Sequence, residues 1–217
     1  MQIKKNDFIE LEFTAKVKET GEVFDSTSLT KGGKTETKPL KICIGEEMVL
    51  PAFEKDFEGK EVGKDYSLEL SPENAFGKRD NSLVKTIPLV VFSQQGIKPV
   101  AGTFYNIDGL LVRVISVSSG RVMADFNNPL SGKNIIYLYK INKMIENEDD
   151  KIKVLAEFFL GAKSEDYKIM LKDGKKILVF DKQNKHLGEK LKLLDKNVKL
   201  LIEKAKKLLN ADLIVEF

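Results

Sequence analysis

The sequence predicts an α+β fold: a β-rich N-terminal part with one short helix, a β-rich middle segment, and a C-terminal part that mixes helices and strands. Short runs in which apolar and polar residues alternate continue to about residue 145 and are typical of strands. Helical spacing of apolar residues begins only after the acidic stretch 146–150. Hydrophobic residues are 42% of the 217 residues, which is enough apolar material for packed cores.

The first strands lie near the N-terminus. Apolar and polar residues alternate at 8–13, Val17 is again apolar, and a turn at Gly21 follows. This pattern predicts a hairpin. Residues 30–39 contain Gly, Lys and Thr but no apolar side chain, so they predict a mobile loop. The run 40–44 predicts the next strand.

One short helix interrupts these strands. Pro51 can open a helix at 52–57, because the first helical position needs no N–H partner. The alternation of Tyr66, Leu68 and Leu70 then predicts a further strand.

The middle segment is predicted to consist of hairpins. Asp108-Gly109 stands between apolar runs and is a strong turn signal. Apolar residues at 112–117 and 122–126 flank a second turn, and the run 135–141 predicts the strand that follows.

The C-terminal residues 146–217 predict a separate α-β-β-α-β domain. Apolar residues at 152–159 have helical spacing, and the runs 167–171 and 176–180 predict a hairpin. A long helix is expected at 187–208 and a final strand at 211–217.

Composition argues against several kinds of chemistry. The net charge is +3 with the two signs interleaved, which does not favour nucleic acid. A chain with one His and one Cys has no His/Cys metal cluster, and no cofactor fingerprint is present, so no metal and no cofactor are expected. His186 is expected to be solvated, and Cys43, in an apolar run, to be a packed thiol. The N-terminus has no signal-peptide pattern and no run is long enough to span a membrane, so a reducing, cytoplasmic location is expected.

Several segments, taken in order, resemble the FKBP family of prolyl isomerases. They are Gly21-Glu22-Val23-Phe24-Asp25-Ser26; the strand 40–45 followed by Val49, Leu50 and Phe53; Glu61-Val62-Gly63-Lys64; Ser71-Pro72-Glu73-Asn74-Ala75-Phe76-Gly77; and the strand 135–141 with Tyr137. The resemblance implies an FKBP-like antiparallel β-sheet wrapped on a short helix, and peptidyl-prolyl cis–trans isomerase activity.

The residues between these segments resemble the insert-in-flap domain of SlyD-like FKBPs. The entry is Arg79-Asp80-Asn81-Ser82-Leu83-Val84 and the exit is Asp125-Phe126-Asn127-Asn128-Pro129-Leu130-Ser131-Gly132-Lys133. The match extends to long archaeal members, which carry an extra C-terminal domain. It implies a discontinuous FKBP domain at 1–82 and 128–145, a small β-rich insert-in-flap chaperone domain at 83–127, and a C-terminal α/β domain at 146–217. The metal-binding tail of bacterial SlyD is absent.

The resemblance also implies the site. Asp25, Leu50 and Phe76 would be catalytic, the backbone N–H of Leu50 holding a substrate carbonyl. The substrate-binding residues would be Phe13, Phe24, Leu40, Val49, Leu50, Phe53, Phe76 and Tyr137. The alternative for the apolar residues is an ordinary sheet core, and Asp25 could be a turn former. Phe76 stands where Tyr is usual and cannot donate that residue's hydrogen bond.

The insert would supply a chaperone surface that binds unfolded or partly folded proteins containing X–Pro bonds. Its candidate residues are Val91, Phe92, Leu110, Leu111, Val112 and Ile115. The alternative is that all of them are interior. An exposed apolar patch would support the first interpretation.

Two alternatives concern the C-terminal part. Its last helix is rich in Lys and could bind acidic partners or nucleic acid while the rest is a catalytically weak FKBP-like binding module or chaperone. These lysines are Lys190, Lys192, Lys196, Lys199, Lys204, Lys206 and Lys207. A solvated helix face explains these charges better, because acids interrupt them and no aromatic is interleaved. The wide apolar face of this helix, including Leu193 and Leu200, predicts a second contact, either with the helix at 152–160 or with another chain in a homodimer.

Overall fold

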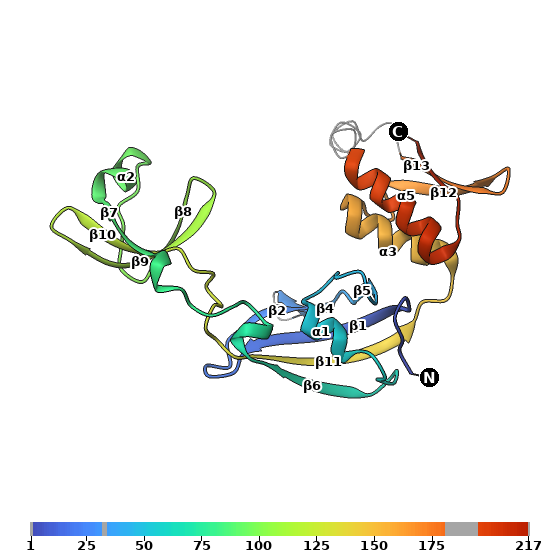
Figure 1. The fold of residues 1–217 in the computed structure, drawn as a ribbon, viewed down its shortest axis with the longest axis horizontal. Helices are drawn as coiled ribbons and strands as arrows, with labels where there is room; N and C mark the ends of the chain where they lie inside the picture. Colours follow the sequence, from blue (N-terminus) through green and yellow to red (C-terminus); the bar gives the residue numbers. More distant parts are fainter. Residues whose placement is uncertain (1, 32–33, 181–194, 217) are drawn as a thin grey trace. The chain divides into compact units, whose positions relative to one another are not determined.

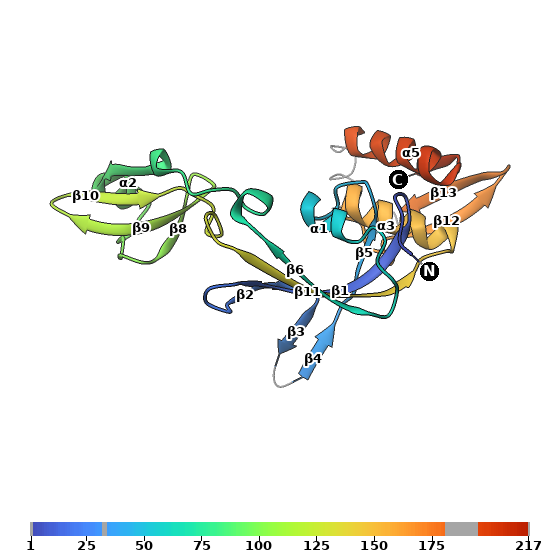
Figure 2. The ribbon, with the colours of Figure 1, turned by 60° about the horizontal axis from the view of Figure 1, so that its bottom comes forward.

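The structure is a computed structural model that describes residues 2–31, 34–180 and 195–216. The chain forms two compact units, traced in Figures 1 and 2. The first unit consists of Met1–Ala15, Asp25–Leu68 and Tyr137–Phe217, and the second of Lys16–Phe24 and Glu69–Ile136. The predicted α+β class is confirmed, whereas the division into three domains stays a prediction.

The elements are as follows. The strands are β1 (Phe8–Val17), β2 (Val23–Ser26), β3 (Ser28–Lys31), β4 (Lys34–Thr37), β5 (Leu40–Cys43), β6 (Asp65–Leu70), β7 (Val84–Pro88), β8 (Phe104–Ile107), β9 (Leu110–Ser118), β10 (Arg121–Asp125), β11 (Ile135–Met144), β12 (Tyr167–Lys172), β13 (Lys175–Phe180) and β14 (Leu213–Glu216). The helices are α1 (Pro51–Asp56), α2 (Leu89–Gln94), α3 (Glu148–Leu160) and α5 (Asp195–Leu209), with short 3₁₀ turns at Pro72–Asn74 and Asn81–Leu83.

A five-stranded sheet has the order β2-β1-β11-β6, and β5 pairs antiparallel with β1. The register sets Leu40 opposite Leu11 and Cys43 opposite Phe8. Helix α1 begins at Pro51 as predicted, and it brings the ring of Phe53 into the interior. The apolar alternation in the sequence therefore predicted the core of this sheet.

The segment between β2 and β5 differs from the prediction. The expected mobile loop at 30–39 contains most of a two-stranded ribbon, in which β3 pairs antiparallel with β4 and Thr30 lies opposite Thr35. The prediction looked for apolar residues, but Thr is β-branched and favours strands.

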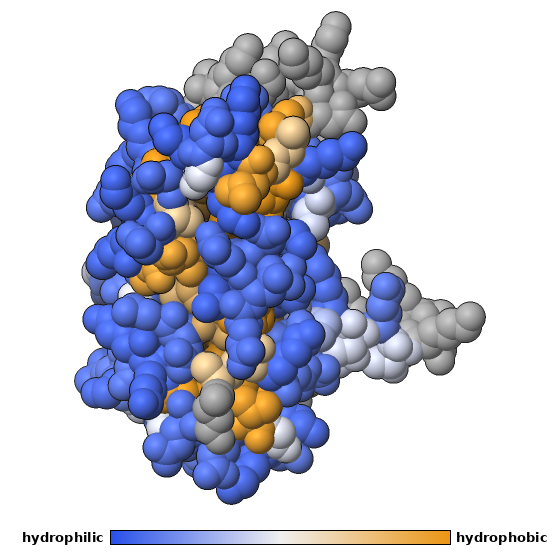
Figure 3. Space-filling view, turned by 90° about the vertical axis from the view of Figure 1, so that its right-hand side faces the viewer, coloured by the Kyte–Doolittle hydropathy of each residue, from blue (hydrophilic) through white to orange (hydrophobic). Residues whose placement is uncertain are grey.

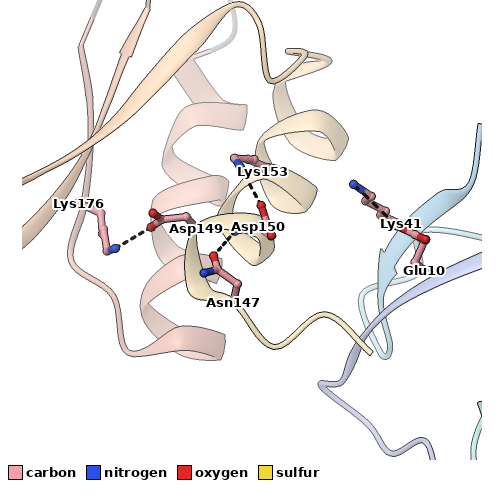
Figure 4. Close-up of polar contacts among 7 residues, drawn as sticks. All are labelled: Glu10, Lys41, Asn147, Asp149, Asp150, Lys153 and Lys176. Carbon is pink, nitrogen blue, oxygen red and sulfur yellow. Dashed lines mark hydrogen bonds and ion pairs between the residues drawn. The ribbon is translucent and has the colours of Figure 1, made fainter. Parts of the chain in front are cut away.

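The first helix of the C-terminal part begins earlier than predicted. Asn147 caps α3, its side-chain oxygen accepting a hydrogen bond from the Asp150 N–H at 3.1 Å (Figure 4). Three residues of the acidic stretch, Glu148, Asp149 and Asp150, therefore form the first turn of the helix, where acidic side chains are favourable next to the helix dipole. The helix ends at Gly161, whose φ of 64° is the left-handed conformation that glycine adopts without strain.

Helix α3 packs on α5 and on β5, so the C-terminal part shares a core with the sheet. Phe8 and Cys43 are buried together with Leu155, Leu201 and other residues of the two helices. Cys43 is the packed thiol that was predicted, and burial raises its pKa to about 12. One side of the molecule, drawn in Figure 3, shows apolar patches between hydrophilic residues.

In the described residues of the C-terminal part, β12, β13 and β14 form one sheet. The predicted hairpin is present as β12 and β13, which pair antiparallel, while β14 runs parallel to β13. The first part of the long helix expected at 187–208 lies outside the described residues, and α5 accounts for the rest.

The second unit contains the antiparallel sheet β7-β10-β9-β8 with the short helix α2. Asp108 and Gly109 form the predicted turn, both at positive φ. Helix α2 was not predicted, because its apolar run is too short to separate a helix from a strand. Its Phe92 fills the core of this sheet.

No helix within the described ranges is long and apolar enough to cross a membrane.

Candidate active site

Two buried aromatic rings form the centre of the candidate site in the first unit. Phe53 from α1 and Tyr137 from β11 are 1% and 5% exposed, and they stack with ring centroids 4.0 Å apart and planes tilted by 20°. Phe13 from β1 is only partly buried, and its ring centroid lies 5.9 Å from each of the two. The helix and the two strands thus bring together three rings that are far apart in the sequence, with one of them partly open to solvent.

A second layer of aromatic residues supports this centre. Phe57 lies 4.6 Å from Phe53 and Tyr139 lies 5.3 Å from it, measured between ring centroids. The Tyr139 hydroxyl donates a 2.5 Å hydrogen bond to Asp56, and burial and this bond raise the pKa of Tyr139. The sequence analysis missed these residues. The signals were present in the sequence. Tyr139 lies two residues after Tyr137, so both point to the same face of the strand, and Phe57 follows Phe53 by one helical turn.

Hydrogen bonds fix Phe13 next to the strand that carries Asp25. The Phe13 N–H donates to the Thr27 hydroxyl at 3.0 Å, and the Phe13 carbonyl accepts from the Thr27 N–H at 3.0 Å. Asp25 is exposed. Burial raises the pKa of Tyr137 to about 12, and the negative charge of Asp25 adds to this effect. The carboxylate of Asp25 therefore acts electrostatically on the Tyr137 hydroxyl.

Leu40, Val49 and Leu50 are all partly exposed. Leu50 stands just before α1, and its carbonyl accepts the N–H groups of Phe53 and Glu54 at 2.9 Å. Its own N–H makes no hydrogen bond to any described residue. Because each backbone N–H can donate one hydrogen bond, this N–H can donate to a ligand.

Phe24 and Phe76 belong to the second unit, and their rings meet edge to face with centroids 5.6 Å apart. Both are partly buried. The Phe76 carbonyl accepts a hydrogen bond from the Ser131 hydroxyl at 3.0 Å. Their predicted roles in catalysis and in substrate binding stay predictions.

The candidate chaperone residues divide into two groups. Phe92 and Val112 are fully buried in the core of the insert, so their assignment to its surface is wrong in this structure, and Val91 packs against that core. Leu110, Leu111 and Ile115 are exposed by 58%, 51% and 38%. Their apolar character alone does not separate the two groups. Further exposed apolar residues of this unit are Val90, Val100, Phe104, Val117 and Met123.

Among the described residues, no group of three or more His, Cys, Asp or Glu side chains could hold a metal ion. The arrangement instead offers a partly open apolar surface, an unpaired backbone donor and a carboxylate. Such a site can bind an apolar group beside a carbonyl and act on it without a proton-transfer residue or a cofactor.

Comparisons with known proteins give the family to which the chain is similar. The family model described as FKBP-type peptidyl-prolyl cis-trans isomerase matches residues 1–98, and the model described as FKBP26, IF domain matches residues 85–130. The chain is 27% identical over 155 residues to the short-type peptidyl-prolyl cis-trans isomerase of Methanocaldococcus jannaschii, a match that covers 68% of this chain and 98% of that protein.

Bacterial relatives carry the name SlyD. The FKBP-type peptidyl-prolyl cis-trans isomerase SlyD of Aeromonas hydrophila is 33% identical over 144 residues, covering 65% of this chain and 64% of that protein. SlyD of Vibrio cholerae is 25% identical over 157 residues, covering 70% of this chain and 73% of that protein. Among solved structures, the three FKBP domains of wheat FKBP73 match 68% of this chain and 42% of that chain, with a TM-score of 0.37 and 14% identity.

Proposed function

The chain is a SlyD-like FKBP-type peptidyl-prolyl cis–trans isomerase with an insert-in-flap domain, and we propose that prolyl bonds rotate on the surface formed by Phe13, Phe53 and Tyr137. The observation that carries this proposal is the partly open Phe13 ring beside the buried stack of Phe53 and Tyr137.

The mechanism follows from amide chemistry. Rotation about a peptide bond faces a barrier of about 18–20 kcal/mol, which comes from resonance between the nitrogen and the carbonyl. Twisting removes this resonance, and the carbonyl becomes less charge-separated. An apolar surface therefore disfavours the planar amide relative to the twisted one. A thousandfold acceleration needs only about 4 kcal/mol of such differential binding.

Polar groups at the edge of this surface orient the substrate. In our proposal the free Leu50 N–H donates to a substrate carbonyl, and Leu40 and Val49 extend the apolar contact on that side. The charge of Asp25, which already acts on Tyr137, faces the carbonyl of the rotating bond. Neither group transfers a proton, since rotation changes no covalent bond.

A protease-coupled assay on a short X–Pro peptide tests the function. The intact protein should accelerate cis–trans exchange well beyond the uncatalysed rate, with no metal or cofactor added. A rate equal to the uncatalysed one would contradict catalysis and leave the alternative, a binding module with a weak or inactive site.

The chaperone activity is assigned to the insert. Phe104 and Leu111 lie on the same face of the sheet as Arg113, opposite the face that carries Val112. Exposed apolar side chains of this kind are favourable contacts for unfolded chains, which present their own apolar residues. Suppression of aggregation of a proline-free unfolded client would support binding that is independent of isomerisation.

A homodimer through the C-terminal part remains a prediction. Helix α5 already buries Leu201 and Ala205 against α3, the contact that was the alternative to a dimer. Leu200 is partly buried, and Leu193 lies outside the described residues. Light scattering on the intact protein tests the dimer, which a monomer at high micromolar concentration would rule out.

Nucleic acid is not proposed as a partner, because Asp195 and Glu203 interrupt the positive charge of α5, and three of its lysines, Lys199, Lys204 and Lys206, pair with carboxylates. A cytoplasmic location also remains a prediction.

A further inference from the structure

The loop between β5 and α1 determines where the Leu50 N–H points. It is a tight turn, with φ of 92° at Gly45 and 54° at Glu47, both in the left-handed region. A non-glycine residue at positive φ persists only where its surroundings hold it. The position of Leu50 therefore depends on what holds this turn.

Glu54 of α1 holds the loop from one side. Its side chain is buried, and burial raises the pKa of its carboxyl. The backbone N–H groups of residues 45–48 act in the opposite direction and lower this pKa. The Oε1 atom of Glu54 is buried and has no hydrogen-bond partner among the described residues. This support comes from the helix that follows the loop.

Helix α5 holds the loop from the other side. Glu46 forms an ion pair with Lys204 of α5, and the two side chains are 5% and 24% exposed. Met48 packs against the core that α3 and α5 share, and its sulfur accepts a hydrogen bond from the Cys43 N–H at 3.3 Å. The loop that carries Leu50 is thus attached to a helix more than 150 residues later in the sequence.

Lys204 differs from its neighbours on α5. Lys199 pairs with Asp195 on the same helix and is 74% exposed, and Lys206 pairs with Asp212 and is 73% exposed. An exposed pair contributes little, whereas a buried carboxylate that loses its cation is left uncompensated. The adjacent Ala205 is fully buried, which fixes this stretch of the helix.

We propose that Lys204 is a positioning residue for prolyl isomerisation: its ion pair with Glu46 fixes the loop that directs the Leu50 N–H toward the substrate carbonyl. The inference rests on the proposed function of Leu50. It assigns to the C-terminal part a direct influence on the isomerase site. Because the N–H bonds the substrate both before and during rotation, its displacement weakens binding in both states and raises KM more than it lowers kcat.

Kinetics of single variants give the first test. Lys204→Met should raise KM for an X–Pro peptide about tenfold and leave kcat within about twofold, since small displacements of binding groups are costly. Lys204→Arg keeps the positive charge and should restore most of the affinity. Lys206→Met, on the same helix but exposed, is the matched control and should leave KM unchanged. An equal rise of KM in Lys204→Met and Lys206→Met would overturn the proposal.

A double variant separates positioning from stability. Glu46→Gln with Lys204→Met removes both charges, so no unpaired carboxylate stays buried and the protein folds even where the single variant does not. Its KM should still be raised although its unfolding midpoint recovers. A normal KM in this variant would show that the pair acts only on stability, and the proposal would be wrong.

A readout without catalysis distinguishes this proposal from the proposed function. In a ¹H–¹⁵N spectrum, Lys204→Met should shift the amide signal of Leu50, and Lys206→Met should not. If the intact protein shows no isomerase activity, the proposed function fails, and the spectrum still decides whether Lys204 sets the loop. An unshifted Leu50 signal would refute that role.

Discussion

Two variants, Phe53→Ala and Phe57→Ala, test whether the aromatic centre is a catalytic surface or only part of the core. Both rings are almost fully buried, and their centroids lie 4.6 Å apart. Truncating a buried Phe costs about 3–5 kcal/mol, so both variants should lower the free energy of unfolding by amounts in this range. Only Phe53 also contacts Phe13 and Tyr137.

The two variants should therefore separate in catalysis. Without the Phe53 ring, Phe13 and Tyr137 lose the side chain that holds them together, and we expect kcat/KM to fall at least about 100-fold, or about 2.7 kcal/mol of transition-state stabilisation. The kcat/KM of Phe57→Ala should stay within about threefold of the value for the intact protein, compared at the same folded fraction. Urea unfolding followed by circular dichroism gives the stability, and a protease-coupled peptide assay gives the rate. Equal losses of kcat/KM in the two variants would refute the assignment of the surface.

Three further predictions concern other parts of the chain. Asp25→Asn should reduce kcat/KM about tenfold. It should change the free energy of unfolding by less than about 0.5 kcal/mol, because the side chain is exposed. It should also lower the pKa of Tyr137 in an ultraviolet titration, and an unchanged titration would contradict the electrostatic effect of Asp25. Replacement of residues 83–126 by a short loop should leave peptide isomerisation intact. It should reduce catalysis of proline-limited refolding about tenfold or more, because the unfolded protein is no longer held near the site. Equal losses of activity on peptide and on protein substrates would contradict a separate binding role of the insert. Burial raises the pKa of Asp125, but hydrogen bonds from Asn127 and the charge of Arg79 hold it below its usual value. A carboxyl with a lowered folded-state pKa stabilises the fold fully above its unfolded pKa of about 3.9, and this contribution is lost as the pH falls through the folded value. Asp125→Asn should therefore weaken this loss of stability in acid, measured by urea unfolding from about pH 5 to pH 2, and an unchanged pH profile would contradict it.

The sequence predicted the local elements better than the contacts between distant elements, whereas the roles of the candidate site residues stay predictions. Alternation along 40–44 and 135–141, and the Pro51 signal, depend on near neighbours, and the structure has β5, β11 and α1 at these places. The motifs around Asp25 and Leu50 supplied the remaining members of the site. These signals are local, so a single sequence contains them.

Contacts made by the C-terminal part could not be predicted in the same way. The spacing of Leu201 and Ala205 shows that one face of α5 is apolar, but it does not show that α3 covers this face or that Phe8 belongs to the same core. Lys204 looked like one of many solvated lysines, because its partner Glu46 is far away in the sequence. Leu111 is exposed and Val112 is buried. They are neighbours on one strand, and the register of that strand decides which of them faces the core.

Cys43 provides a built-in reporter of how the C-terminal helices separate from the sheet. It is the chain's single thiol, it is fully buried in the core shared by β5, α3 and α5, and its raised pKa keeps it protonated at neutral pH. A thiol reagent therefore reacts with it only after that core opens. The labelling rate of the unmodified protein thus measures how often the support of the Leu50 loop is lost, and a bound prolyl peptide that stabilises the closed form should slow the reaction.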